Sequence, residues 1–211
     1  MNIVLCILLG YCIGGINPAY IISKLKGFDI RKHGSGNAGA SNAMMMMGKK
    51  VGALIAVFDI FKAFIAVILA AKLFPQLKIA KVLAGVCCIL GHIFPALMGF
   101  RGGKGLACLG GFVMAYDIRI FGILLLCEAI LALTLDYVCV VPITGSMIFT
   151  TIYAFTTSDP VGTLLLSAIS IIILLKHIEN LKRIQNGTEA HISFLWRKDE
   201  EIARIKQNSN S

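Results

Sequence analysis

The chain has 211 residues, of which 57% are hydrophobic and only 15% are charged, and its formal net charge is +9. Soluble domains usually carry charge on about a quarter of their residues, so this composition excludes an ordinary soluble protein. The Lys and Arg residues cluster between apolar runs, which indicates membrane topology signals and disfavours nucleic acid as a partner. We therefore expect one polytopic membrane domain whose partners are anionic lipid and an anionic substrate.

Apolar runs near the length that a membrane-spanning helix needs recur along the chain. We place spans at about 2–23, 51–73, 79–99, 105–117, 119–137, 138–157 and 161–176. The run 105–117 is short and rich in small residues, which favours a tilted, half-buried or partly re-entrant helix, and six spans remain an alternative. We assign residues 1–190 to the membrane domain and 191–211 to a cytoplasmic tail.

The basic residues predict the orientation of these spans. With seven spans and the amino terminus outside, fifteen of the 20 Lys and Arg residues fall inside and four outside, as the positive-inside rule requires. Lys62 lies within the second span, three residues after Asp59, and this spacing favours an ion pair on one helical face. Glu128 lies within the fifth span and has no obvious partner nearby in the sequence.

Three polar segments fall on the predicted inner face. The first, residues 33–42, has three glycines among Ser and Asn side chains, which favours a backbone conformation whose amides bind an oxyanion. The second ends in Gly-Gly-Lys-Gly at residues 102–105, a pattern typical of an anion cradle at a helix start but without the spacing of a nucleotide-binding P-loop. The third places His177 and Asn180 on one helical face. Taken singly, the first segment is more typical of a plain loop and the third of a helix cap, and the second fits a basic connector as well as an anion site.

Together the three segments resemble the bacterial integral-membrane acyl-phosphate:glycerol-3-phosphate acyltransferase family (PlsY type). That family carries Ser-Gly-Asn-x-Gly-Ala-Thr-Asn, matched by 35–42, then Gly-His-x-x-Pro leading to Gly-Gly-Lys-Gly, matched by 91–105, and His-x-Glu-Asn-x-x-Arg-x-x-x-Gly-x-Glu, matched by 177–189. The resemblance implies an all-α, multi-pass protein of the bacterial inner membrane with seven transmembrane helices. Its amino terminus would be outside, and its carboxyl terminus and active face would be cytoplasmic.

The resemblance also implies an activity and a site. The activity is transfer of an acyl group from acyl-phosphate to the first hydroxyl of glycerol 3-phosphate, giving lysophosphatidate for phospholipid synthesis without a metal or other cofactor. Carried over by position, Ser35, Lys104 and His177 are expected to be catalytic. The expected substrate-binding residues are Gly36, Asn37, Ser41, Asn42, His92, Gly102, Gly103, Asn180 and Glu189. Membrane lipid is a further partner, nucleic acid is not, and docking of a soluble acyl-phosphate synthase stays open.

The mechanism that the resemblance suggests is direct attack of the acceptor hydroxyl on the acyl carbonyl. A covalent acyl-Ser35 intermediate is less favoured, because no activating base is apparent within its own loop.

The sequence departs from the family at two places. Met45 stands where the family usually has an arginine, and the segment around Pro142 replaces a basic residue and a serine-rich turn. These losses keep two alternatives: a divergent paralogue that binds acyl-phosphate or phosphate without turnover, and a small transporter. The transporter hypothesis predicts an internal repeat, and we find no convincing one.

Overall fold

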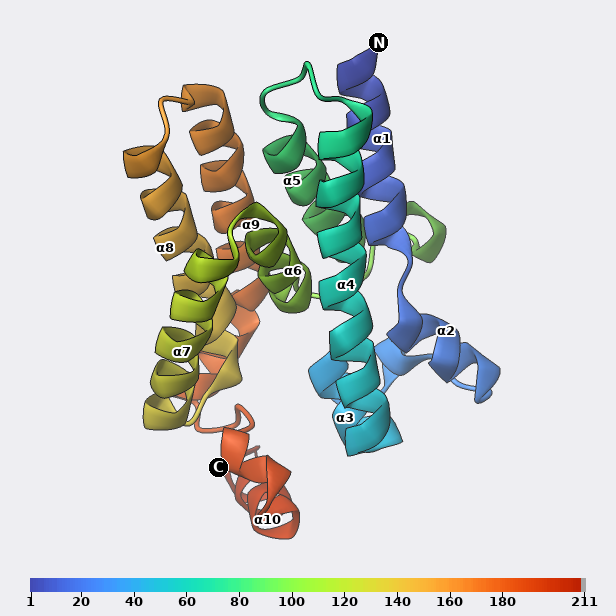
Figure 1. The fold of residues 1–211 in the computed structure, drawn as a ribbon. Helices are drawn as coiled ribbons and strands as arrows, with labels where there is room; N and C mark the ends of the chain where they lie inside the picture. Colours follow the sequence, from blue (N-terminus) through green and yellow to red (C-terminus); the bar gives the residue numbers. More distant parts are fainter. Residues whose placement is uncertain (210–211) are drawn as a thin grey trace.

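The computed structural model describes residues 1–209, and these residues are helical with no strand (Figure 1). The α-helices in chain order are α1 (Asn2–Gly15), α2 (Pro18–Leu25), α3 (Ala40–Met47), α4 (Lys49–Leu73), α5 (Ala80–Ile93), α6 (Leu106–Tyr116), α7 (Ile118–Leu135), α8 (Val141–Thr156), α9 (Pro160–Gln185) and α10 (Lys198–Ser209). The short 3-10 helices are η1 (Ile30–Lys32), η2 (Ala96–Met98), η3 (Val138–Val140) and η4 (Ile192–Leu195). Residues 210 and 211, the last of the predicted tail, lie outside the described residues.

The described residues include six helical segments long and apolar enough to cross a membrane, together with the shorter apolar helix α6. The predicted all-helical membrane class is therefore confirmed. Helix α6 has 11 residues and is about 16 Å long, well short of the roughly 30 Å hydrocarbon core, as its small residues suggested.

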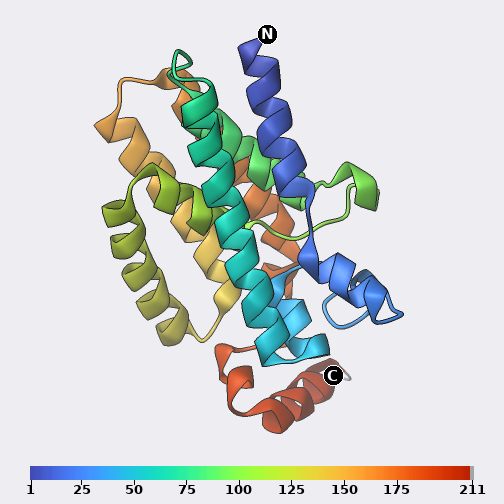
Figure 2. The same cartoon turned by 45° about the vertical axis from the view of Figure 1, so that its right-hand side comes forward.

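Two groups of helices enclose α6 (Figures 1 and 2). Helices α1, α4 and α5 pack together on one side, α7, α8 and α9 on the other, and α6 contacts α4, α5, α7 and α8. Phe112 of α6 packs edge-on against Phe149 of α8 in the centre of the core, and both side chains are fully buried. The short helix thus joins the two groups, which also meet directly where α5 contacts α9.

The first predicted span is broken in the structure. Helix α1 ends at Gly15 and α2 begins at Pro18, because proline has no N–H for the helix ladder and restricts the residue before it. Asn17 caps α2 by accepting from the amide of Tyr20, and its own amide donates to the carbonyl of Ala38. Helix α2 consequently turns away from the axis of α1 (Figure 2).

The buried ion pair of α4 stabilises this break. The Lys62 ammonium lies 2.7 Å from Asp59 Oδ1 and donates to the carbonyl oxygen of Ile16 at 2.6 Å. That carbonyl loses its helical partner where α1 ends, and a buried carbonyl without a partner is costly. The predicted pair therefore exists, and its ammonium also donates a hydrogen bond to the backbone carbonyl that follows the first helix.

Helix α9 extends beyond its predicted end at residue 176 and continues to Gln185. Asp159 caps its start by accepting from the amide of Gly162. His177 and Asn180 consequently lie on one continuous helix with Arg183. The last turns of α9 lie toward the end of the molecule opposite the amino terminus, where the chain leads into α10 (Figures 1 and 2).

Candidate active site

The first polar segment, residues 33–42, forms a loop that we call the glycine loop. One side chain organises it: the Asn42 amide nitrogen donates to the carbonyls of Ile30, His33 and Asn37 at 2.9 to 3.2 Å. Its oxygen accepts from the amide of Ser35 at 3.0 Å. Asn42 is 1% exposed, so its role is to shape the loop from inside.

The glycines of this loop allow the close approach of Asn42. Gly34 has φ of +58°, and a Cβ at this position would lie 2.2 Å from Asn42 Oδ1. Any larger residue would therefore collide with the side chain that holds the loop together. The amide of Gly36 donates to the carbonyl of His33, so the amides of Ser35 and Gly36 are both occupied within the loop. Ser35, Gly36 and Ser41 lie exposed on its surface, and Asn37 is half-buried.

The second polar segment differs from the amide cradle that its sequence indicated. The amides of Gly102 and Gly103 donate to the carbonyls of Ile93 and His92, at 3.1 and 3.0 Å, so these two donors are already occupied. A Cβ at Gly103 would lie 2.1 Å from His92 Nε2. The glycines therefore supply close packing over His92 rather than free amide donors, and this part of the prediction is wrong.

His92 is 3% exposed and faces the ion pair of α4. Its Nδ1 lies 3.1 Å from the Lys62 ammonium, which donates, so the proton of the neutral imidazole lies on Nε2. The ring thereby connects Lys62 to the backbone of Gly103, one residue before Lys104. This arrangement gives His92 a supporting position behind the glycine run.

Asp59, His92 and Cys108 form a buried group whose candidate metal-ligand atoms lie within 4.8 Å of one another. The Lys62 ammonium already lies 2.7 Å from Asp59 Oδ1 and 3.1 Å from His92 Nδ1. A cation at the same donors would be repelled by this charge. The group therefore fits a lysine-centred polar network better than a metal site.

A network of charged and polar side chains forms where the second and third segments meet. The Lys104 ammonium donates to the side-chain oxygen of Asn180. The amide nitrogen of Asn180 donates to Glu189 Oε1, and Arg183 Nε donates to Glu189 Oε2 at 2.6 Å. We call Lys104, Asn180, Arg183 and Glu189 the charged cluster. It joins residues 76 positions apart into one continuous network.

Burial modifies the electrostatics of Lys104. Desolvation lowers the pKa of its ammonium, and the positive charge of Arg183 lowers it further, against the opposing influence of Glu189 and Glu179. Within the charged cluster itself, the two cations Lys104 and Arg183 exceed the single carboxylate of Glu189, and this positive charge favours an incoming anion such as phosphate. Glu189 is 8% exposed and bonds to Asn180 and Arg183, so its carboxylate orients these two side chains.

His177 lies one turn before Asn180 on α9 and is 3% exposed. Its Nδ1 donates to the carbonyl of Ile173 at 2.8 Å, which fixes the ring. In the neutral ring Nε2 is then the acceptor nitrogen, suited to receive a hydrogen bond from a hydroxyl.

The structure thus brings Lys104, Asn180 and Glu189 into direct contact, with His177 on the adjacent helical turn. Among the described residues, no hydrogen bond or ion pair joins the glycine loop to this cluster. Arg31, just before the loop, reaches the second polar segment, since it donates to the carbonyl of Met98 at 2.6 Å. Met98 ends η2, in the connection that leads to Gly102.

Two residues of this region were given no role by the sequence reasoning. Arg183 lies within the third motif and three residues after Asn180, a spacing that places both on one helical face. Arg31 pairs with Asp29 through both carboxylate oxygens, and this pairing lowers the pKa of Asp29. The Asp-x-Arg spacing at the start of the basic loop was the available signal.

The two departures from the family pattern lie on different elements. Met45 is half-buried on α3, directly after the glycine loop. Pro142 is buried in the first turn of α8, where its missing N–H costs no helical hydrogen bond.

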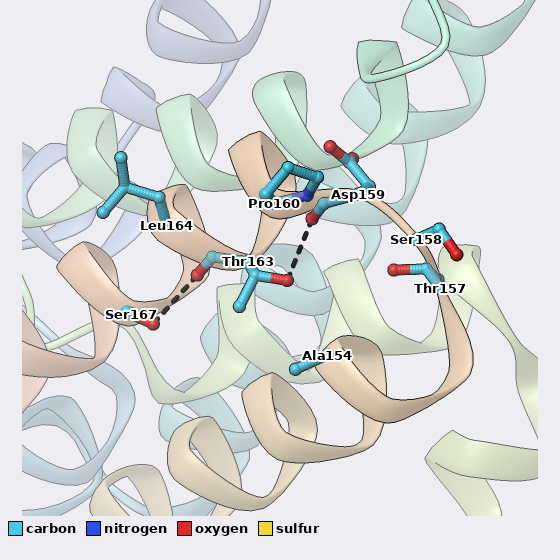
Figure 3. Close-up of a pocket in the computed structure, with 8 residues that line it drawn as sticks. All are labelled: Ala154, Thr157, Ser158, Asp159, Pro160, Thr163, Leu164 and Ser167. Atoms are coloured by element: carbon cyan, nitrogen blue, oxygen red, sulfur yellow. Dashed lines mark hydrogen bonds between the residues drawn. The ribbon is translucent and has the colours of Figure 1, made fainter.

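Two hollows lie outside the charged cluster. A small apolar pocket of about 90 Å³ is lined by α6, α7 and α8, beginning at Leu106 and including Glu128. Glu128 accepts from Thr144 through Oε2, and Oε1 has no hydrogen-bond partner in the described structure. A second, open hollow of about 550 Å³ lies at the α8–α9 connection (Figure 3). Three of its hydroxyls are occupied, since Thr157, Thr163 and Ser167 donate to the carbonyls of Tyr153, Asp159 and Thr163.

Comparison with known proteins agrees with this geometry. The family model described as glycerol-3-phosphate acyltransferase matches residues 4–187. A glycerol-3-phosphate acyltransferase of Bacillus subtilis (strain 168) is 37% identical over 197 residues, which is 92% of this chain and all of the relative. One from Aquifex aeolicus is 34% identical and covers 90% of this chain and 98% of the relative.

Solved structures show the same fold. The crystal structure of PlsY, an integral membrane glycerol 3-phosphate acyltransferase, in its glycerol 3-phosphate form matches with a TM-score of 0.83 at 32% identity, covering 92% of this chain and 98% of that one. Its lysophosphatidic acid form matches with a TM-score of 0.78 at 31% identity, covering 90% and 95%. On the family model, the relatives and the fold together, this chain belongs to the glycerol-3-phosphate acyltransferase family.

Proposed function

We propose that this protein transfers an acyl group from acyl-phosphate to the first hydroxyl of glycerol 3-phosphate, producing lysophosphatidate and inorganic phosphate. The observation that carries the proposal is the charged cluster, in which Asn180 and Arg183 are oriented by the Glu189 carboxylate and Lys104 donates to Asn180. This cluster lies within a chain that matches glycerol-3-phosphate acyltransferases over nearly its whole length. Phosphate is common to both substrates, so an excess of positive charge suits either of them.

The acceptor would bind to the charged cluster. Lys104 and Arg183 would neutralise its phosphate, and Asn180 would add a hydrogen bond, with both α9 side chains held by Glu189. His177 Nε2 would accept the hydrogen bond of the acceptor hydroxyl. Because Glu189 is negative and hydrogen bonded, we assign it to orientation rather than to direct phosphate binding.

The acyl-phosphate would bind between the glycine loop and Lys104. Ser35, Gly36, Asn37 and Ser41 are accessible at the loop surface, and Asn42 keeps the loop in shape. Leu106, two residues after Lys104, is one of the residues that line the small apolar pocket. The apolar wall of this pocket would contact part of the alkyl chain. His92, Gly102 and Gly103 would act through the placement of Lys104.

The reaction then needs a single displacement. The acceptor oxygen attacks the acyl carbonyl carbon, the bond from that carbon to the phosphate oxygen breaks, and the hydroxyl proton passes to His177 or to the leaving phosphate. Positioning and the positive charge of Lys104 supply the rate. A covalent acyl-Ser35 is not favoured, because no described histidine or carboxylate forms a hydrogen bond with the Ser35 hydroxyl.

We further propose that residues 1–190 form the catalytic domain of a bacterial inner-membrane protein and that the charged cluster faces the cytoplasm. The positive-inside count supports this orientation, since it places Lys104 and the basic residues that follow Lys176 on the inner side. Docking of a soluble acyl-phosphate synthase on the same basic face remains part of the hypothesis. The comparisons favour neither the non-catalytic paralogue nor the transporter.

Phosphate release from a synthetic acyl-phosphate tests the proposal. The purified protein in lipid is assayed with and without glycerol 3-phosphate, and the product is identified by mass. We expect release that depends on the acceptor and yields lysophosphatidate. Acyl-phosphate that binds without being consumed would support the non-catalytic paralogue and overturn the proposed activity.

A further inference from the structure

Helix α10 folds back on the connection that follows α9 (Figures 1 and 2). Arg204 of α10 donates to the carbonyl oxygens of Gly187 and Glu189 and pairs with Glu201. Asn208, one turn later, donates to the carbonyl of Gly187 at 2.8 Å. We call Glu201, Arg204 and Asn208, with the carbonyls that they hold, the tail clasp.

The clasp is itself anchored on the membrane domain. Glu201 accepts from the amide of His191 at 2.8 Å and lies 3.3 Å from the His191 ring. Asp136, which ends α7, accepts from the amide and the hydroxyl of Ser193, both at 3.0 Å. The chain between α9 and α10 is therefore held both by α7 and by α10.

The residue inside this clasped segment is Glu189. Its backbone carbonyl is bound by Arg204, and its side chain binds Asn180 and Arg183. A carboxylate on a loop can position its partners only if its own backbone is held in place. A shift of about 1 Å in that backbone would break hydrogen bonds of this length. Arg204 thus acts on Asn180 and Arg183 through Glu189.

Arginine suits this task because its planar guanidinium presents several donors at fixed angles. Here these donors reach two backbone carbonyls and one carboxylate. Hydrogen bonding to Glu201 raises the pKa of Arg204, so the charge that holds the loop persists. The family model ends at residue 187, so Glu201, Arg204 and Asn208 lie outside the part of this chain that matches it.

We propose that Arg204 is a positioning residue of the acceptor site, which it orders by holding the backbone on which Glu189 lies. This inference rests on the proposed function, since it concerns the binding of glycerol 3-phosphate. It assigns the segment 188–209 a part in acceptor affinity and none in the bond-breaking step.

The test compares Arg204→Ala with wild type in the full-length protein in lipid. We expect the KM for glycerol 3-phosphate to rise about three- to tenfold, while kcat and the KM for acyl-phosphate change less than about twofold. Arg197→Ala is the matched control, because Arg197 is exposed on the same tail and its described hydrogen bonds are made by its backbone alone. Arg204→Lys keeps the positive charge but lacks the planar arrangement of donors, and it is expected to give a KM for glycerol 3-phosphate between those of wild type and Arg204→Ala.

A double-mutant cycle separates positioning from a general effect on folding. If Arg204 acts through Glu189, then Arg204→Ala adds little to the KM increase of Glu189→Gln. Additive increases, an Arg204→Ala KM equal to that of Arg197→Ala, or a fall in kcat at unchanged KM would each overturn the inference. Wild-type protein without acceptor-dependent turnover would instead contradict the proposed function.

Discussion

The glycine loop and the charged cluster are built in opposite ways. The glycine loop is held by one uncharged, buried side chain, Asn42, whose hydrogen bonds go to backbone groups within twelve residues. The charged cluster is held by side chains bonding to side chains, across 76 residues between Lys104 and Asn180. A loop built on local backbone contacts keeps its shape without a ligand. A cluster with excess positive charge is stabilised when an anion binds, because the anion neutralises that charge.

Removing Lys104 breaks the charged cluster at its most important point and should have the largest effect. We expect Lys104→Ala to lower kcat/KM by about 10²- to 10³-fold, because a positioned charge at a reacting phosphate contributes on this scale. The thermal unfolding temperature should stay near that of wild type, since Lys104 lies outside the apolar core. Lys72→Ala, at the exposed end of α4, is the control. Turnover by Lys104→Ala at the wild-type rate would remove this lysine from the proposed site.

Removing the organiser of the glycine loop tests the other region. In Asn42→Asp a carboxylate oxygen replaces the amide nitrogen that approaches three carbonyls, and each unpaired buried polar group costs about 1 to 3 kcal/mol. We expect kcat/KM to fall by about tenfold to a hundredfold, together with faster amide hydrogen exchange in residues 30–42. An active variant with unchanged exchange in the loop would show that Asn42 does not shape it.

Alkaline pH should affect the charged cluster and leave the glycine loop intact. Burial and Arg183 lower the pKa of Lys104, so its ammonium deprotonates below the ordinary value of 10.5. We expect kcat/KM for glycerol 3-phosphate to decline with rising pH in a range below 10.5.

The Lys104 side chain binds its proton more tightly in the unfolded chain than in the folded protein, so deprotonation of Lys104 at high pH raises the free energy of unfolding. The decline in kcat/KM therefore reports weaker substrate binding rather than denaturation. Lys104→Arg, whose guanidinium stays charged, is expected to lose this part of the pH profile. A decline that persists in that variant would assign it to another group.

The smallest expected effect comes from adding a charge beside the glycine loop, which would make the two regions more alike. We expect Met45→Arg to lower the KM for glycerol 3-phosphate by about two- to fivefold, as a half-exposed cation near a phosphate contributes modestly. Met45→Leu conserves the size without the charge and should behave as wild type. Acceptor saturation that is identical in all three proteins would show that the missing arginine is unimportant here.

The fold was largely predictable because membrane helices depend on local composition. The apolar runs located α4, α7 and α8 within three residues of their observed bounds, and they located the start of α5, which ends six residues before the predicted 99. The errors occurred where a polar contact decides the boundary: Asn17 and Pro18 divide the first run, and α9 continues nine residues past its predicted end at 176. Hydropathy marks the end of an apolar run, and a helix can continue beyond that point in polar sequence, as α9 does.

The site was predictable as residue types and less so as roles. The motifs pointed to Lys104, His177 and Asn180, and the structure brings Lys104 and Asn180 into contact. The expected amide donors of Gly102 and Gly103 were wrong, because their hydrogen bonds go to the backbone of α5. Spacing along the chain indicates which hydrogen-bonding groups are present. Contacts with distant segments decide which of these groups remain available for a substrate.

By itself the sequence determined that this is a helical membrane protein, where its apolar segments lie and which polar motifs could handle phosphate. These properties depend on neighbours within a few turns, so composition and spacing contain them. Only the tertiary structure decided that Lys62 satisfies the carbonyl of Ile16, that Glu189 holds Asn180 and Arg183, and that Arg204 holds the backbone of Glu189. Each of these contacts depends on how separate segments meet, and burial makes that meeting decisive because a polar group removed from water must find a partner.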